Sequence, residues 1–247
     1  MKTKHFFKWV FLALAIFYAS LPLHGEGKHV TQYRMLNVVP PTAEVAEELC
    51  RDMVDLYRSG AIDSAALICA IVPQGNPPID KASQLLETYR TFQKKLEGSG
   101  LPFGILLQAT MGHGGPGNIP TPFQKLVRGK NGKPIYSFCP EDKGFLEYIG
   151  KSIRTLAQGN PAFFMVDDDT RLLTLREGCF CPLHIARFNQ LHSTNYTAEQ
   201  LRKLVYEQDF LAHQYDEMLQ KTMEDYFRFI RQTLDDIDPD LHCSLCI

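Results

Sequence analysis

The sequence lacks an excess of charge of either sign. Lys and Arg together number 26, Asp and Glu number 28, and the formal net charge is −2. The absence of a basic excess gives no indication of nucleic-acid binding, and the absence of an acidic tail gives no indication of disorder. Glycine and proline, at 17 and 15 residues, are near average, which excludes collagen-like and low-complexity chains. We find no repeat at a solenoid or propeller period.

Cysteine is too sparse for a small disulfide scaffold, since the chain has only seven in 247 residues. The odd number leaves at least one thiol without a partner in the same chain. Hydrophobic residues make up 45% of the chain, which is enough for one sizeable core or two small ones. The composition therefore indicates a globular domain.

The N-terminus resembles a targeting segment. Lys2, Lys4 and Lys8 precede the apolar run Trp9–Leu21, which Pro22 ends. This order predicts a secretory signal peptide over residues 1–25 and a secreted or periplasmic protein, with no stable membrane span after the signal is removed. The run is shorter than the roughly 20 residues of an ordinary membrane span, although an uncleaved N-terminal anchor is the alternative.

From residue 33 to the end, short apolar runs alternate with amphipathic ones. Strands are expected at 35–39, 65–72, 103–109, 162–166 and 242–247, and helices at 42–58, 79–96, 140–157 and 197–234. This alternation predicts an α/β domain with a parallel sheet that is buried on both faces. The two candidate architectures are an open doubly wound sheet and a (β/α)8 barrel of the TIM type. No G-x-G-x-x-G follows the first strand, so dinucleotide binding has little support.

Three consecutive carboxylates, Asp167, Asp168 and Asp169, follow the predicted strand 162–166. Strand alternation would put Asp167 and Asp169 on one face. Like charges beside an apolar wall raise the pKa of at least one carboxyl, which can then act as a general acid. Arg171 is close enough to keep another of the three ionised. The alternatives are a turn cap with an ion pair to Arg171, and a site for a hard cation such as Mg²⁺ or Ca²⁺.

A second cluster has the spacing C-x-C-x2-H. Cys179, Cys181 and His184 are three zinc-compatible ligands, and a tetrahedral site needs a fourth. Cys139, Cys50 or a cysteine of another subunit could supply it. The alternative is a pair of buried free thiols beside a helix N-terminus. Cys243-x-x-Cys246 also has metal or redox spacing, but it falls within the last predicted strand, where core packing is expected.

His113 follows the third predicted strand within a glycine-rich loop. A barrel would place it on the same face as the three aspartates, where it could hydrogen-bond a substrate. The alternative is a loop histidine without a role.

Several of these segments together resemble a known family. The stretch Val166–Leu172, followed by Gly178–Pro182 and Ala186–Phe188, is similar to the clan A glycoside hydrolases, and especially to barrel domains related to microbial β-galactosidases with a cysteine-rich loop. Residues 128–135 and 138–140 resemble the hairpin and helix start that lead into that strand. The resemblance implies a (β/α)8 barrel that acts on carbohydrate. It places Asp169 at the general acid/base position and Asp168 at the asparagine position before it.

Only five of the eight strands of a barrel are recognisable. The nucleophile of the clan lies after the seventh strand, and a retaining mechanism needs two carboxyls about 5.5 Å apart. We therefore expect residues 33–247 to form roughly the first five β/α units of a glycoside hydrolase-like barrel, inactive by itself and prone to self-association. The alternatives are a carbohydrate-binding pseudo-enzyme and a metal-dependent hydrolase or deacetylase that uses Asp167–Asp169 with His113. Catalysis is expected to need no cofactor, and zinc would be structural.

Overall fold

The computed structural model describes residues 33–40, 43–114, 119–172 and 177–246. The predicted signal peptide, residues 1–25, lies outside the described residues. Contacts between Cα atoms divide the chain into Met1–Tyr33 and Arg34–Ile247, and all helices and strands of the described residues belong to the second unit.

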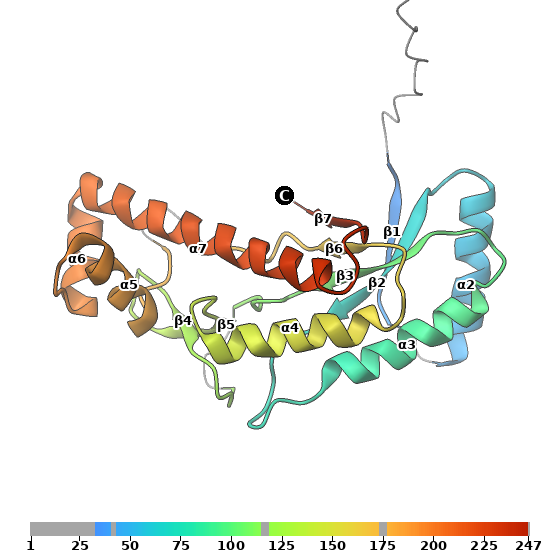
Figure 1. Ribbon diagram of the computed structural model, residues 1–247, viewed down its shortest axis with the longest axis horizontal. Helices are drawn as coiled ribbons and strands as arrows, with labels where there is room; N and C mark the ends of the chain where they lie inside the picture. Colours follow the sequence, from blue (N-terminus) through green and yellow to red (C-terminus); the bar gives the residue numbers. More distant parts are fainter. Residues whose placement is uncertain (1–32, 41–42, 115–118, 173–176, 247) are drawn as a thin grey trace, which may run out of the picture. The chain divides into compact units, whose positions relative to one another are not determined.

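The centre of this unit is a five-stranded sheet whose strands are all parallel (Figure 1). Its order follows the chain: β1 (Met35–Val38), β2 (Ser64–Ala70), β3 (Phe103–Gln108), β6 (Phe164–Val166) and β7 (Cys243–Leu245). The five predicted strands and their parallel pairing are thus confirmed. The order of the described strands contains no reversal, whereas a doubly wound sheet has a reversal at its ligand-binding crevice.

Four helices pack side by side against the sheet. They are α2 (Ala43–Arg58), α3 (Lys81–Lys95), α4 (Lys143–Ala157) and α7 (Asp209–Asp235), and each contacts the next in that order (Figure 1). Alternate strand residues, such as Leu67, Ile105 and Val166, form a single core cluster with the apolar stripes of these helices. Phe103 begins this face in β3, and its ring stacks on Tyr89 of α3 at 5.1 Å between centroids.

The other face of the sheet carries both small residues and large ones such as Ile68 and Leu106. Gly104 of β3 is aligned with Ala66 of β2, and the ring of Phe163 lies over the glycine. A Cβ atom at Gly104 would come within 2.5 Å of that ring, so only glycine fits there without a shift.

The last strand differs from the expectation. Residues 242–247 were predicted to form a buried strand, but Ser244 and Leu245 of β7 are exposed and Cys243 is only partly buried. β7 pairs with β6 on one side only, which makes it an edge of the described sheet. The predicted core packing is confirmed in part: Cys243 packs, partly buried, against the core cluster, whereas Cys246 is not a member of that cluster.

Two insertions interrupt the alternation of strands and helices. A hairpin of β4 (Lys125–Val127) and β5 (Pro134–Phe138) precedes α4, and α5 (Pro182–His192) with α6 (Ala198–Glu207) precedes α7. The single helix predicted over 197–234 is two helices, because Gln208 has an extended backbone with φ −127° and ψ 113°. At the start of α6 the side chains of Thr197 and Gln200 form the predicted capping box.

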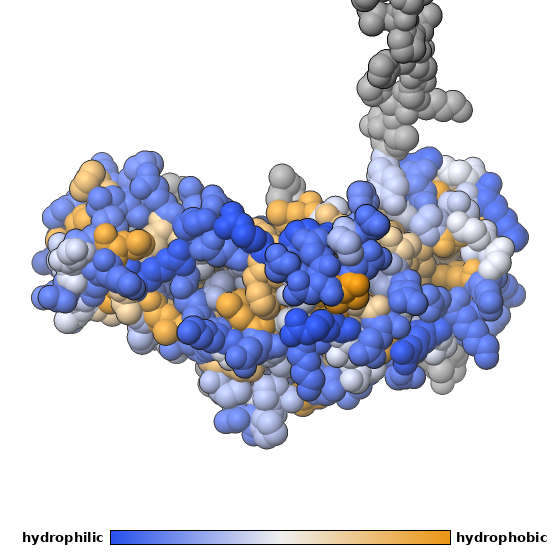
Figure 2. Space-filling view, in the orientation of Figure 1, coloured by the Kyte–Doolittle hydropathy of each residue, from blue (hydrophilic) through white to orange (hydrophobic). Residues whose placement is uncertain are grey.

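The surface that Figure 2 shows is mostly hydrophilic, with hydrophobic side chains scattered among polar ones. The exposed apolar residues include Leu191 of α5, Tyr206 of α6 and Phe210 of α7.

Candidate functional site

A pocket of about 140 Å³ lies beside the carboxyl ends of β3 and β6. The loop after β3 contributes His113, the hairpin contributes Arg128 and Ser137, and the segment after β6 contributes Asp169, Arg171 and Glu177. The carboxyl edge of a parallel sheet is where α/β proteins commonly bind ligands. Three of the five predicted catalytic and substrate-binding residues, His113, Asp169 and Arg171, therefore line one pocket.

The side chain of Asp169 is only 11% exposed, whereas that of Asp168 is 57% exposed. Both of its carboxylate oxygens accept from the backbone N–H of Ala109, at 3.1 and 3.0 Å, and Oδ2 lies 3.1 Å from Nε2 of His113. Burial raises the pKa of Asp169, while His113 and the Ala109 N–H act in the opposite direction. A sheltered carboxyl with a raised pKa, in a pocket, can carry a proton to a substrate.

The backbone that holds Asp169 is itself constrained. Ala109 has φ +51°, a left-handed conformation that costs an alanine about 1–2 kcal/mol. The buried hydroxyls of Thr110 and Thr170 are 2.8 Å apart and join the segments after β3 and β6. Non-glycine residues in this conformation often lie at functional sites, which agrees with the position of Ala109 behind the pocket.

The other two aspartates are placed differently from the expectation. The strand ends at Val166, and the backbone then turns, with the N–H of Thr170 donating to the carbonyl of Asp167 at 3.2 Å. Strand alternation therefore does not govern the three side chains. Asp168 is exposed and lies 3.8 Å from the guanidinium of Arg171, which is a surface pair. Asp167 accepts from the N–H of Asp168. Within the described residues, these aspartates and His113 form no group of three or more converging metal-ligand atoms.

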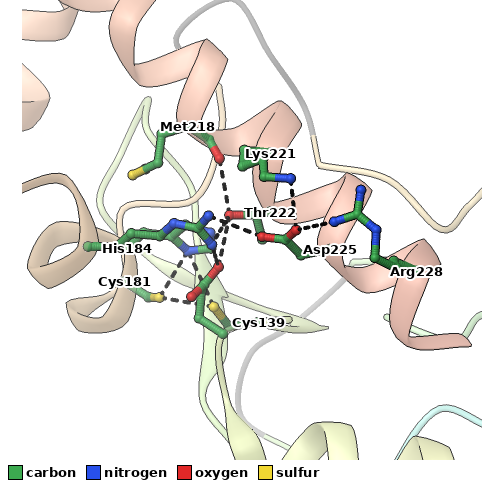
Figure 3. A network of polar contacts seen from close by, with 10 residues as sticks. Cys139, Cys181, His184, Met218, Lys221, Thr222, Asp225 and Arg228 are labelled. Atoms are coloured by element: carbon green, nitrogen blue, oxygen red, sulfur yellow. Dashed lines mark hydrogen bonds and ion pairs between the residues drawn. The ribbon is translucent and has the colours of Figure 1, made fainter. Parts of the chain in front are cut away.

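A buried group of three cysteines and one histidine lies next to the pocket. Ligand atoms of Cys139, Cys179, Cys181 and His184 all lie within 4.8 Å of one another. Nδ1 of His184 is 3.3 Å from Sγ of Cys139 and 3.5 Å from Sγ of Cys181. Figure 3 shows Cys139, Cys181 and His184 pointing toward one another. The fourth member is thus Cys139, directly after β5, and not Cys50 of α2.

The donor set fits a tetrahedral zinc ion. Bonds of about 2.3 Å to a tetrahedral metal put neighbouring sulfur atoms about 3.8 Å apart, and Cys139 and Cys181 are 3.5 Å apart. Contacts with the thiols of Cys139 and Cys179 lower the pKa of Cys181, which is also the N-cap of α5. A thiolate at a helix N-terminus is favoured by the helix dipole. Nε2 of His184 is buried and has no hydrogen-bond partner in the described structure.

Backbone contacts join this group to the wall of the pocket. The N–H of Val127 donates to Sγ of Cys179 at 3.4 Å, and the N–H of Phe180 donates to the carbonyl of Val127 at 2.9 Å. Arg128 and Cys179 form a β-bridge, and the buried hydroxyl of Tyr215 donates to the carbonyl of Cys179 at 2.6 Å. The hairpin that carries Arg128 and Ser137 is therefore attached directly to the loop that carries two of the ligands.

A polar network supports the same loop from α7. Arg187 of α5 forms an ion pair with Glu141, and its guanidinium contacts Thr222 at 3.2 Å and Asp225 at 3.3 Å. Figure 3 shows Thr222 and Asp225 on α7 beside the cysteines. The hydroxyl of Thr222 donates to Glu141 at 2.9 Å. The network links the middle of α5 to the residues before α4 and to α7, and so keeps the three elements around the cysteines together.

Comparison with protein-family models and with curated proteins finds no match to this chain. In the part of the chain that is described, no helix has the length and apolar character needed to cross a membrane.

Proposed function

We propose that this chain is a secreted, glycoside hydrolase-like protein that binds carbohydrate in the pocket beside β3 and β6. In this proposal the five parallel β/α units belong to a (β/α)8-type barrel, and the Cys139–Cys179–Cys181–His184 group binds a structural zinc ion. The observation that carries the proposal is Asp169, a sheltered carboxyl with a raised pKa that lines a pocket at the carboxyl edge of the sheet. Glycosidases use a carboxyl of this kind to protonate the leaving oxygen.

The order of the strands supports the barrel. Five parallel strands that follow the chain order, with their helices packed in one row, have the arrangement of successive units in a (β/α)8 barrel. The resemblance to clan A glycoside hydrolases places the acid/base residue at Asp169, which is the aspartate that lines the pocket.

The zinc ion would stabilise the fold and take no part in the reaction. Four protein ligands close the coordination shell of a tetrahedral ion, so no position remains for a substrate or a water molecule. The residues of the chain would then perform the chemistry of the pocket. Asp169 would hold the transferable proton, and His113 would bind the substrate and, by its contact with Oδ2, hold the carboxyl in position.

A glycan array followed by calorimetry on the full chain tests this proposal. We expect binding to at least one saccharide, and Asp169→Asn should weaken that binding or change its pH dependence. Asp168→Asn is the matched control, because it removes the neighbouring exposed carboxylate that lies outside the pocket. Failure of the wild-type protein to bind any saccharide, or equal effects of the two substitutions, would contradict the proposal.

A further inference from the structure

Arg128 is fixed in the wall of the pocket by its backbone. Its N–H donates to the carbonyl of Lys133 at 3.0 Å, and its own carbonyl accepts from Gly132 at 2.9 Å. It also forms the β-bridge with Cys179. The side chain is partly buried and lies over Gly114, where an added Cβ atom would be 3.8 Å from Nη2. The backbone of Arg128 is therefore fixed, and its guanidinium lies at the pocket beside the loop that carries His113.

This guanidinium has no acidic partner among the described residues. Of the three other arginines that are partly buried among the described residues, Arg187 pairs with Glu141 and Asp225 and Arg231 pairs with Asp235, whereas Arg202 likewise forms no ion pair. The two carboxylates that line the pocket make their contacts elsewhere, since Asp169 faces His113 and Glu177 accepts from the hydroxyl of Tyr206 at 3.4 Å. A partly buried guanidinium that forms no ion pair of its own can pair with an anionic group of a ligand, even with Asp169 and Glu177 elsewhere in the same pocket lining.

We propose that the pocket selects an acidic sugar, a hexuronic acid unit whose carboxylate pairs with Arg128. This inference rests on the function proposed above and adds the substrate class. The planar guanidinium presents two parallel N–H groups that match the two oxygens of a carboxylate, whereas the hydroxymethyl group of a neutral hexose offers a single oxygen. Arg171, whose contact with Asp168 is long and exposed, adds positive charge at the same pocket.

The test compares sugars that differ only at C6. The full chain is titrated with methyl glucuronide and methyl galacturonide, and with the matching methyl glucoside and methyl galactoside, while binding is followed by NMR. The variants are Arg128→Gln and Arg128→Lys. The first removes the positive charge, and the second keeps the charge but lacks the two parallel N–H groups of the guanidinium. Lys130→Gln is the matched control, because it removes one positive charge from the same hairpin at an exposed position outside the pocket lining.

We expect at least one uronide to bind about tenfold or more tightly than its neutral counterpart, as a charge-assisted bidentate pair would give. Arg128→Gln should bring this ratio close to one, Arg128→Lys should leave an intermediate ratio, and Lys130→Gln should leave it unchanged. Equal affinities for acidic and neutral sugars, or a preference that survives Arg128→Gln, would overturn the inference and leave the proposed carbohydrate site intact. Absence of binding to all four sugars by a folded wild-type protein would overturn both.

Discussion

The sulfur atoms of Cys139 and Cys181 lie 3.5 Å apart, although the two residues are 42 positions apart in the sequence. One follows the last strand of the hairpin, and the other caps the N-terminus of α5. Their contact closes a long loop of chain, and a metal ion bound between them would stabilise the folded state in which that loop is closed.

The Cys139–Cys179–Cys181–His184 group leads to a prediction about zinc content. Purified protein should contain close to one zinc ion per chain, and Cys139→Ser should lose most of it. Because binding free energy contributes to folding free energy, the melting temperature should fall by at least about 5 °C. Metal content by mass spectrometry and thermal unfolding by circular dichroism measure the two effects.

Cys50→Ala is the control for this experiment. Cys50 is also buried, and the sequence allowed it as the fourth ligand, but in the structure it lies on α2 outside the Cys3His group. This variant should keep its zinc, even if the loss of a buried side chain lowers its melting temperature. Loss of zinc from Cys50→Ala, or a metal-free wild-type protein of unchanged stability, would contradict the assignment.

Asp169 should make the stability of the protein depend on pH. Burial raises the pKa of this carboxyl in the folded state, so the unfolded chain releases its proton more readily. The stabilising contribution is complete below the unfolded pKa of about 3.9 and is lost as the pH rises through the folded pKa. Asp169→Asn cannot ionise, and at pH 7 it should be at least as stable as the wild-type protein.

The comparison requires melting temperatures of both proteins between pH 3.5 and pH 8. The advantage of Asp169→Asn should shrink toward the acid end, where the carboxyl is protonated in both states of the wild-type protein. A wild-type protein that is the more stable of the two at pH 7 would mean that the Ala109 and His113 contacts outweigh burial.

The contact between Gly104 and Phe163 predicts a pairwise effect. Gly104→Ala should destabilise the fold by about 1–3 kcal/mol, because the new methyl group would overlap the ring. In a Phe163→Ala background the same substitution should cost less than half as much. Urea unfolding of the four proteins gives the coupling energy. Equal costs in the two backgrounds would show that the ring is not the obstacle.

From the edge position of β7 we expect the protein to self-associate. In the described sheet β7 is an edge strand, and Leu245 is 40% exposed, so one backbone edge without a neighbouring described strand lies beside an exposed apolar side chain. The protein should sediment as a mixture of sizes that shifts upward with concentration. Leu245→Lys should move it toward the monomer, while Leu191→Lys, which changes an exposed leucine on α5, should not. A wild-type protein that is monomeric at every concentration would remove this expectation.

Most of the fold could be predicted because its elements have clear periodicity and clear ends. Apolar runs such as residues 103–109 are buried strands, and Thr197 with Gln200 begins α6 as its pattern indicates. The break at Gln208 could not be predicted, since neither glycine nor proline occurs there and the apolar stripe continues across it. The exposure of β7 also differs from its sequence pattern, because burial depends on what covers a strand and not on the strand alone.

The candidate site could be predicted in part. The spacing of Cys179, Cys181 and His184 correctly indicated a cluster, but spacing cannot choose a distant fourth ligand, and Cys139 is identified only by the position of the hairpin. Arg128 was not recognised as a pocket residue, because a lone arginine in a hairpin has no sequence signature. The difference in exposure among the three aspartates likewise depends on the turn after Val166, which places the side chain of Asp169 inward and that of Asp168 in solvent.

The β-bridge between Arg128 and Cys179 has a consequence for how such a protein can change during evolution. Arg128 lines the pocket and Cys179 belongs to the Cys3His group, and because the two are paired across this bridge, neither segment can shift in register without displacing the other. If the proposed carbohydrate site is correct, we expect related proteins to change their sugar preference by exchanging pocket side chains rather than by changing the length of the segment between Cys179 and His184.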